Sequence, residues 1–600
     1  MVFSLSPSVE VKESSIDATF NEVAATGGAF AGAFNWGPVE EVVTVSSEAK
    51  LISNFGKPDE SNNVQWWSAA NFLSYGNNLK CVRVVGENAV NASDSKDIVE
   101  ESIVIVAPEV AEGEEAIVSV KEVIFDHVFE SLPQRVKLSV DGEELTQDMY
   151  SLSLNEENKL VVIFNEEVLV DSVVALETNK FAIKNQEHFD SLIGMDARIY
   201  AKYPGAIANG LKVIVATNDN WEETSKLKLF SYKPAENEIS VAVIDNGKFE
   251  GEGSVIWLKE LMSTQVTQVN YGEISNHYKT FINNNCPYLW VNGDLTGVTE
   301  VILSNGVTDN NVSDADRIRG YNLFKSAETI DFRCLISGPA SSTLANHLIS
   351  NIAEYRKDCV AYISPDIDSM NSLDIEKAVI EFRNTLPSSS YFFMDGNWKY
   401  QYDSYNDCYI WLPCNPDIAG LQVRTADTNE PWFSPAGYNR GILKNVIKLK
   451  WNPDKTSRDE LYSNEINPVI IESGFGALLL GDKTGLSKPS SFSRINVRML
   501  FIILEKAIAT FAKYSLFEFN DEPTRAAFRN RTNNYLSNVA GRRGIEDDYF
   551  VKCDDENNDA TVKNNNGFVA AIKVRALRSI NFIQLHFQSY DYGIEFEEIA

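Results

Sequence analysis

Histidine is scarce in this chain of 600 residues, which contains five of them. No two stand at the spacing that places two ligands on one metal ion, and neither an HExxH segment nor a CxxC pair occurs. A GxSxG nucleophile elbow is also missing. The sequence therefore offers no motif specific to a metalloenzyme or a serine hydrolase, and we expect no catalytic residue, no metal ion and no cofactor.

Long uncharged apolar segments are lacking as well. The longest apolar stretch lies within 493–521 and is interrupted by Glu505 and Lys506, so we expect no segment inserted in a membrane. The first residues, MVFSLSPSVEVKESS, have neither the basic nor the apolar part of a targeting signal. The seven cysteines are scattered and odd in number, which favours reduced thiols and folding in a cytosol.

Positive charge is in short supply. The chain has 53 Lys and Arg against 85 Asp and Glu, a formal charge of −32. This disfavours a nucleic-acid partner, because phosphate binding depends on clustered cations. Residues 91–190 alone have 23 acidic against 7 basic side chains, whereas 491–550 have 9 basic against 7 acidic. We interpret the acidic block as a solvated surface, or as one kept outward while the more basic end of the chain faces an acidic partner.

The hydrophobic patterns predict several domains. Residues 21–90 alternate strand-like and helix-like segments, and the same α/β pattern resumes in 331–450. Residues 91–190 consist of short Val/Ile-rich runs separated by EGEE, DGEE and NEEN, which predicts an all-β insertion. We expect a second middle domain over 191–330 and a C-terminal domain over 451–590. The predicted fold class is multidomain α/β and α+β, with mixed-sheet core domains.

The strongest helix signal is SRINVRMLFIILEKAIATFAKYSLFEFND, residues 493–521. Apolar residues recur at the helical spacing i, i+3, i+4 and i+7, which predicts a helix with a core-facing stripe. The stripe consists of Val497, Leu500, Phe501, Leu504, Ile508 and Phe511. Ser493 is the expected N-cap.

Both ends of the chain look like short strands on polar tethers. Val9 and Val11 alternate with charged residues within 1–20, and Ile594 and Phe596 alternate with glutamates within 591–600. A strand with one apolar face needs a sheet to join. From the pattern alone, that sheet belongs either to the same molecule or to a neighbouring one.

One glycine-rich segment, GFGALLLGDKTG, approaches a nucleotide-binding motif. Gly476 and Gly481 have P-loop spacing, but Asp482 separates the second glycine from Lys483, and no helix start follows. A dinucleotide fingerprint fails because Leu479 occupies the third glycine position. We therefore do not predict a nucleotide site here.

Several long segments are distinctive: they include GAFNWGPVEEVVTVSSEAKLISNFGKP, AANFLSYGNNLKCVRVV, AKYPGAIANGLKV, GDKTGLSKPSSFSRINVRMLF and RSINFIQLHF, and they lie at both ends and through the C-terminal half. In sequence and in order they resemble one known family, the tail sheath proteins of contractile-tailed bacteriophages (myophages). The chain departs from the family pattern at Ser8, at Ile207-Ala208, in the shortened LSNGVTDNN and throughout 91–190. Members of the family vary in the domains inserted on their outer surface.

The resemblance implies a structural subunit and no enzyme. Sheath subunits of this family stack as six-fold rings around an inner tail tube and contract to drive the tube through the host envelope. Their terminal arms add strands to a neighbour's sheet, which here implies intersubunit roles for Val9, Val11, Ile594 and Phe596. The implied partners are further copies of the chain, the tube protein, and baseplate and tail terminator proteins. The implied location is the virion tail, assembled in the host cytoplasm.

In this family the C-terminal domain faces the tube. The resemblance therefore makes a set of arginines candidates for contacts with the tube or with neighbouring subunits: Arg494, Arg498, Arg525, Arg529 and Arg531. The alternative is that they pair inside one subunit with Glu505, Glu518 and Asp547. The sequence does not decide between these two roles.

Three other functions compete with a phage sheath. A phage-derived injection device (tailocin) uses the same kind of subunit. A surface-binding adhesin is suggested by the β-rich insertion at 91–190, and a cytosolic α/β enzyme by the loop at 474–485. The length and order of the matching segments favour the sheath.

Overall fold

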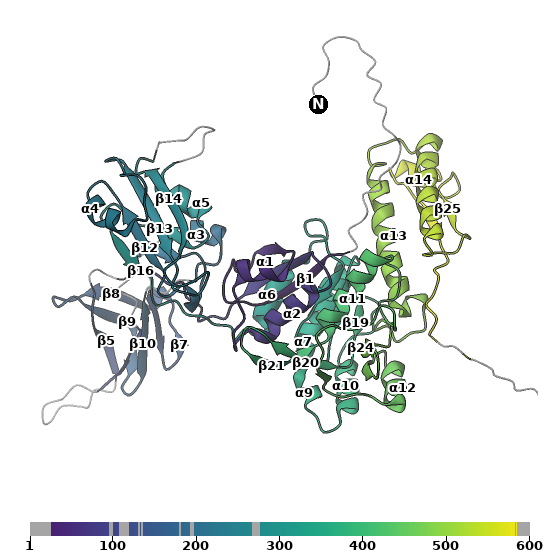
Figure 1. The fold of residues 1–600 in the computed structure, drawn as a ribbon, viewed down its shortest axis with the longest axis horizontal. Helices are drawn as coiled ribbons and strands as arrows, with labels where there is room; N and C mark the ends of the chain where they lie inside the picture. The colour runs from purple at the N-terminus through teal and green to yellow at the C-terminus, as the bar shows by residue number, and fades with distance from the viewer. Residues whose placement is uncertain are drawn as a thin grey trace, which may run out of the picture.

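The computed structural model describes most of the chain. The described residues are 26–94, 100–106, 119–129, 133, 136–178, 182–192, 197–266, 276–581 and 584. In Figure 1 an α/β core occupies the middle, two β-rich units lie on one side of it, and a unit with the long helices α13 (Ile495–Lys513) and α14 (Glu522–Gly541) lies on the other. The predicted fold class, multidomain α/β and α+β with mixed-sheet cores, is confirmed.

The core is built on a six-stranded sheet with the order β19-β18-β17-β1-β3-β2. The strands are β1 Gly28–Ala33, β2 Val42–Val45, β3 Leu79–Val84, β17 Cys334–Ile336, β18 Val360–Ile363 and β19 Phe392–Met394. All neighbours are parallel except β2, which is antiparallel to β3. Gly28 of β1 lies opposite Cys334 of β17, so the sheet joins two distant parts of the chain.

Helices cover both faces of this sheet, as a mainly parallel sheet requires. One face carries α2 (Asn63–Leu73) and α11 (Asn415–Thr428). The other carries α6 (Asp314–Asn322), α7 (Ser342–His347) and α10 (Ile375–Asn384). Most residues of β1 (GAFAGA) are small, because neighbouring side chains approach the strand closely. A Cβ on Gly28 would lie 2.6 Å from the ring of Phe72. Although α6 falls within the expected middle domain, it packs on β1 and β3 of the core.

Smaller elements complete the core. They are α1 Glu48–Phe55, α8 Glu354–Arg356, α9 Ile367–Met370, α12 Lys455–Ser463, the three-stranded sheet of β20 Trp398–Asp403, β21 Cys408–Pro413 and β22 Lys448–Leu449, and the hairpin of β23 Val469–Glu472 and β24 Gly476–Leu479. Ser47 caps α1 by accepting a hydrogen bond from Lys50 N–H, as an N-cap serine does.

The acidic block forms two antiparallel sheets that share one apolar core. The sheets are β4-β10-β6-β7 and β5-β9-β8, with β4 Glu100–Val104, β5 Ser119–Val128, β6 Val136–Val140, β7 Glu143–Glu144, β8 Tyr150–Leu154, β9 Lys159–Leu169 and β10 Val173–Thr178. Phe125, Leu160 and Leu176 are buried between them, while the glutamates at 122, 166 and 167 are exposed. Because side chains alternate between the two faces of each strand, the apolar residues face the core and the charged residues face solvent.

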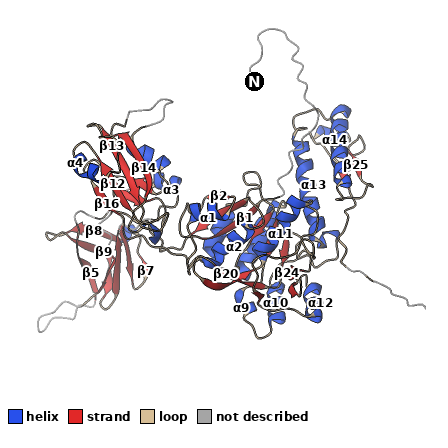
Figure 2. Cartoon of the chain, viewed as in Figure 1, coloured by secondary structure: helices blue, strands red, loops and turns tan. Residues whose placement is uncertain are grey.

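The middle unit contains an antiparallel sheet, β14-β13-β12-β16 (Figure 2), and the two-stranded sheet β11-β15. Its elements are β11 Ile199–Ala201, β12 Lys212–Ala216, β13 Glu238–Ile244, β14 Val255–Ser263, β15 Leu289–Val291, β16 Glu300–Ile302, α3 Gln186–Ser191, α4 Trp221–Thr224 and α5 Tyr278–Asn285. A fully buried Arg83 ties this unit to β3 of the core, donating to Pro204 O at 2.7 Å and to Phe34 O at 2.7 Å. Burial lowers the pKa of Arg83 to about 9.

The C-terminal unit packs α13 against α14, with β25 (Phe550–Lys552), α15 (Ala560–Asn564) and β26 (Ala571–Lys573) alongside. Of the predicted stripe on α13, Val497, Leu500 and Leu504 are buried and the other members half-buried. The predicted N-cap is wrong. Arg494 occupies that position, because Ser490 begins a separate 3₁₀ turn at 491–493 and the Ser493 hydroxyl donates to Lys488 O. In the described part of the chain, no helix could cross a bilayer.

Candidate functional site: interaction surfaces of the C-terminal unit

The expected arm residues Val9, Val11, Ile594 and Phe596 lie outside the described residues. In the described part of the C-terminal unit, β25 and β26 form an antiparallel pair, with Val551 opposite Ile572. Within the described residues this sheet has two strands, so each strand has one edge without a strand partner. Phe550, at the start of β25, is 55% exposed. An apolar strand edge of this kind can accept a further strand.

Arg494 and Arg498, at the start of α13, contact residues of the same subunit. Arg494 forms an ion pair with Asp482 at 2.8 Å and donates to the hydroxyl of Tyr462. Arg498 is buried: its guanidinium lies 4.0 Å from the ring centre of Phe492 and 3.1 Å from the Tyr391 hydroxyl. Desolvation lowers the pKa of Arg498.

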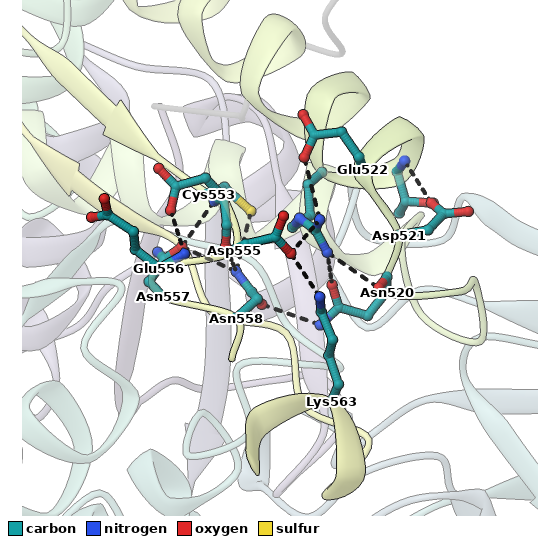
Figure 3. Close-up of polar contacts among 12 residues, drawn as sticks. Asn520, Asp521, Glu522, Cys553, Asp555, Glu556, Asn557, Asn558 and Lys563 are labelled. Carbon is teal, nitrogen blue, oxygen red and sulfur yellow. Dashed lines mark hydrogen bonds and ion pairs between the residues drawn. The ribbon is translucent and has the colours of Figure 1, made fainter. Parts of the chain in front are cut away.

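Arg525 and Arg529, on α14, connect that helix to the loop after β25. Figure 3 shows Glu522 at the start of α14 together with Asp555 and Lys563. Arg525, 2% exposed, contacts Asp555 at 3.0 Å, and Asp555 also accepts a hydrogen bond from Lys563 at 2.7 Å. Arg529 pairs with Glu522 at 2.7 Å and donates to the carbonyl of Cys553. These contacts hold the β25–β26 pair against α14.

Among the five candidate arginines, three thus have carboxylate partners in the same subunit. Arg494 pairs with Asp482, Arg525 with Asp555, and Arg529 with Glu522. None of these carboxylates is among the three partners predicted from the sequence. One of those three, Glu505, interacts electrostatically with Arg498. Asp482 and Asp555 lie in loops that only the folded chain brings near to these arginines, whereas Glu522 lies in the first turn of α14, seven residues before Arg529.

Arg531 differs from the other four because it is exposed and stacks on an exposed ring, with 5.9 Å between its guanidinium carbon and the centre of Tyr514. Tyr514 begins the turn between α13 and α14. In this turn four apolar side chains are 63–105% exposed: Tyr514, Leu516, Phe517 and Phe519. We call residues 514–519 the apolar tip. Clustered exposed apolar side chains mark a contact surface for another protein.

The glycine-rich loop near 474–485 has a structural role. Gly474 and Gly476, with φ of +90° and +83°, form the turn of the β23–β24 hairpin, where side chains would strain the backbone. Lys483 donates to the carbonyl of Tyr462, and Asp482 pairs with Arg494. Neither charged group of the loop is therefore turned to a ligand.

The described residues also contain no group of three or more His, Cys, Asp or Glu side chains able to hold a metal ion. All seven cysteines are free, and six of them are buried. Burial raises the pKa of Cys286, Cys334 and Cys359 to about 12, so these thiols stay protonated.

A groove of about 660 Å³ lies where the core meets the C-terminal unit. It is lined by the segment after α11 (residues 432–440), by 480–482, by Asn496 of α13, by Arg543 and by 577–581. Three arginines line it, Arg440, Arg543 and Arg578, and the structure gives none of them a carboxylate within 4.0 Å among the described residues. This groove is not predictable from the sequence. Its arginines are far apart in the chain, and no local pattern signals them.

An open strand pair, an exposed apolar tip and an arginine-lined groove are typical of a protein class whose members work as subunits of a larger assembly. Comparison with known proteins identifies the family. Residues 321–485 match the phage tail sheath protein central domain, and 487–589 match the phage tail sheath C-terminal domain. The chain is 31% identical to the tail sheath protein of Enterobacteria phage T4 over 99% of both chains, and 30% identical to that of Vibrio phage KVP40 over 99% of both.

A solved structure supports the same fold. The crystal structure of the sheath tail protein Lin1278 from Listeria innocua matches with a TM-score of 0.52 and 11% identity, covering 93% of this chain and 96% of that one. The chain belongs to the phage tail sheath family. It is a structural subunit of a contractile bacteriophage tail sheath and hence a component of the virion tail, as the sequence resemblance predicted.

Proposed function

We propose that copies of this chain stack as six-fold rings around the inner tail tube, linked by their terminal arms. The supporting observation is the β25–β26 pair, which has open edges within the described residues, in a chain whose two ends each have the alternating sequence pattern of an amphipathic strand. In this arrangement Val9 and Val11 at one end, and Ile594 and Phe596 at the other, add strands to sheets of neighbouring subunits. Because the arms are held by backbone hydrogen bonds, the folded bodies of the subunits can rotate during contraction and still stay connected.

The C-terminal unit faces the tube in this proposal, with the apolar tip and Arg531 as its contacts. These side chains are exposed, and the described contacts give them no role in stabilising the subunit. Arg494, Arg498, Arg525 and Arg529 act indirectly, since they hold α13 and α14 in place. Baseplate and tail terminator proteins would contact the two ends of the same helical assembly.

Force generation in this proposal requires no catalysis. Subunits assemble in the host cytoplasm in a metastable extended form and bury more apolar surface on contracting. If each subunit buried roughly 400 Å² more, about 25 cal/mol per Å² would supply at most about 10 kcal/mol per subunit. The acidic β insertion at 91–190, placed outside, would keep the assembly soluble through its charge.

Truncation of the arms tests this function. Chains that lack residues 2–15, or that stop at Tyr590, should stay folded and monomeric, while the full chain forms tubes in negative-stain images. Circular dichroism and thermal unfolding serve as the folding control. A truncated chain that still forms tubes of normal diameter and length would refute the linking role of that arm.

A further inference from the structure

The groove where the core meets the C-terminal unit, which we call the arginine groove, is lined by arginines from both. Arg440 belongs to the core, while Arg543 and Arg578 belong to the C-terminal unit. Among the described residues that line the groove, Asp482 alone is acidic, and its charge is already balanced by an ion pair with Arg494 at 2.8 Å. The arginine groove therefore has uncompensated positive charge, in a chain whose formal charge is −32.

Two of these cations come from different units and lie against the same aromatic ring. The guanidinium carbons of Arg440 and Arg543 are 5.4 and 5.9 Å from the ring centre of Phe433. Like charges that are brought together repel each other, and Arg440 is also half-buried, so that desolvation lowers its pKa. Its Nε donates to Ser434 O at 2.8 Å, which is a neutral acceptor. An anion in the groove would offset both costs.

Arg543 occupies a position at which helices usually have glycine. It follows the end of α14 with a φ of +62°. Its N–H donates to Ala540 O at 2.9 Å, and the N–H of Gly544 donates to Val539 O at 2.9 Å. This is a Schellman motif, in which glycine is the usual residue at the positive φ because a side chain there is strained. A cation suits the negative end of a helix. The same strained backbone also places this guanidinium in the arginine groove.

A buried acceptor in the groove shows which anion would fit. Asn496 of α13 lines the groove and is 6% exposed. Its Nδ2 donates to Leu577 O at 3.0 Å, while its Oδ1 has no hydrogen-bond partner in the described structure. Since a buried acceptor without a donor is costly, the ligand should supply a hydroxyl as well as negative charge. Inorganic phosphate near neutral pH does so, because it keeps at least one hydroxyl while its other oxygens accept hydrogen bonds from arginine.

We propose that the arginine groove binds inorganic phosphate, with its oxygens on the three arginines and its hydroxyl on Asn496 Oδ1. Because the arginines belong to both units, the bound ion would clamp the C-terminal unit to the core. A phosphate ester is the other source of the same group. Above its second pKa of about 6 an ester is fully ionised and has no hydroxyl for Asn496, so inorganic phosphate should bind more tightly. The proposal does not depend on ring assembly or on the terminal arms.

Equilibrium dialysis of the full-length chain with radiolabelled phosphate tests the site. The native chain should bind about one ion per subunit. The groove variant Arg440→Gln/Arg543→Gln/Arg578→Gln should bind about tenfold more weakly or worse, and Arg578→Gln alone, at an exposed position, should also weaken binding. The control Lys226→Gln/Lys228→Gln/Lys233→Gln removes the same charge from exposed positions of the middle unit and should change the affinity less than about twofold. Equal binding by the native chain and the groove variant would overturn the proposal.

Competition with sulfate tests the role of Asn496. Sulfate has the shape of phosphate but no hydroxyl at pH 7.5, so it should displace phosphate only at about tenfold higher concentration. In Asn496→Ala this preference should fall to about twofold or less, a ratio that a general loss of stability would not alter. Phenyl phosphate should compete about as poorly as sulfate. A native chain that binds sulfate or phenyl phosphate as tightly as inorganic phosphate would refute the contact between Asn496 and a phosphate hydroxyl.

Hydrogen exchange tests the clamp. Saturating phosphate should slow the exchange of backbone amides in 436–440 and 577–581 of the native chain, because both segments line the groove. The groove variant should show no such slowing under the same conditions, with sedimentation used to match the assembly state of the two samples. Exchange that stays unchanged in a chain with phosphate bound would show that the ion does not join the two units.

Discussion

Lys399 and Asp417 form a buried ion pair, with Nζ and Oδ1 separated by 2.8 Å and side chains 0% and 1% exposed. Lys399 belongs to β20 and Asp417 to the first turn of α11, so the pair fixes the helix to the small sheet beside the core. The hydroxyl of Tyr75 donates to the same carboxylate oxygen at 3.0 Å, and Lys399 also donates to Lys444 O at 3.2 Å. This network joins segments more than 300 residues apart.

We predict that Lys399→Met destabilises the core by about 3–5 kcal/mol, because it leaves the Asp417 charge buried without a cation. The double variant Lys399→Met/Asp417→Leu should recover most of that loss, since neither charge remains. Urea unfolding followed by tryptophan fluorescence measures both. Equal stability of the single and double variants would contradict this account of the pair.

Asp395 should make the stability of the core depend on pH. It is buried beside Ser364, whose hydroxyl donates to Oδ2 at 2.6 Å, and burial raises its pKa to about 7. Between about pH 4 and pH 7 the native state then binds more protons than the unfolded chain, so the free energy of unfolding falls as pH rises and levels off above pH 7.

We predict that Asp395→Asn reduces the stability difference between pH 5 and pH 8 by about 2–3 kcal/mol, at 1.36 kcal/mol per pKa unit. Urea unfolding at the two pH values measures it. Asp459→Asn, at an exposed position of α12, is the control and should leave the difference unchanged. An unaltered pH dependence in Asp395→Asn would mean that another group causes it.

Gly485, at the junction of the core with the C-terminal unit, leaves room for one aromatic ring. A Cβ there would lie 2.0–2.5 Å from atoms of the Phe392 ring, which is fully buried in β19. Gly485→Ala should therefore displace Phe392 and cost about 1–3 kcal/mol or more. Gly541→Ala, at the end of α14 with nothing within 4 Å of the added carbon, should have no such cost. Thermal unfolding of the two variants makes the comparison.

The apolar tip should matter for assembly and not for folding. Phe517 and Phe519 are 105% and 83% exposed, so Phe517→Ser/Phe519→Ser should change the stability of the subunit by less than about 0.5 kcal/mol. If the tip contacts the tube, the variant should sediment less with isolated tail tubes. Leu373→Ser, at a 109% exposed site on the core, controls for lost apolar surface. Undiminished sedimentation of the tip variant would exclude this contact.

Local patterns were sufficient to predict much of the fold. GAFAGAF became β1, LKCVRVV became β3, and the acidic Val/Ile runs became a pair of antiparallel sheets, because each element is specified by its own periodicity and flanking turns. The apolar stripe of α13 was predictable for the same reason. Its start was not, since the N-cap depends on which of several nearby serines begins the preceding turn.

Properties that depend on distant segments could not be predicted. Nothing in the local sequence shows that Gly28 pairs with Cys334, or that Arg494 finds Asp482. Long arginine side chains can reach either a partner molecule or a carboxylate of their own subunit, and only the fold decides. The arginine groove needs five separate segments to form, so its residues carry no local signal.

The pairing of β1 with β17 also has a consequence during synthesis. After β3 emerges from the ribosome, roughly 250 residues must be translated before β17 can complete the sheet, which takes on the order of 10–50 s at 5–20 residues per second. Over that interval one edge of β1 and the apolar faces beside it lack their covering elements. The nascent chain is most prone to aggregate during this interval. Its need for chaperones should therefore be greatest then, before any subunit assembles with another.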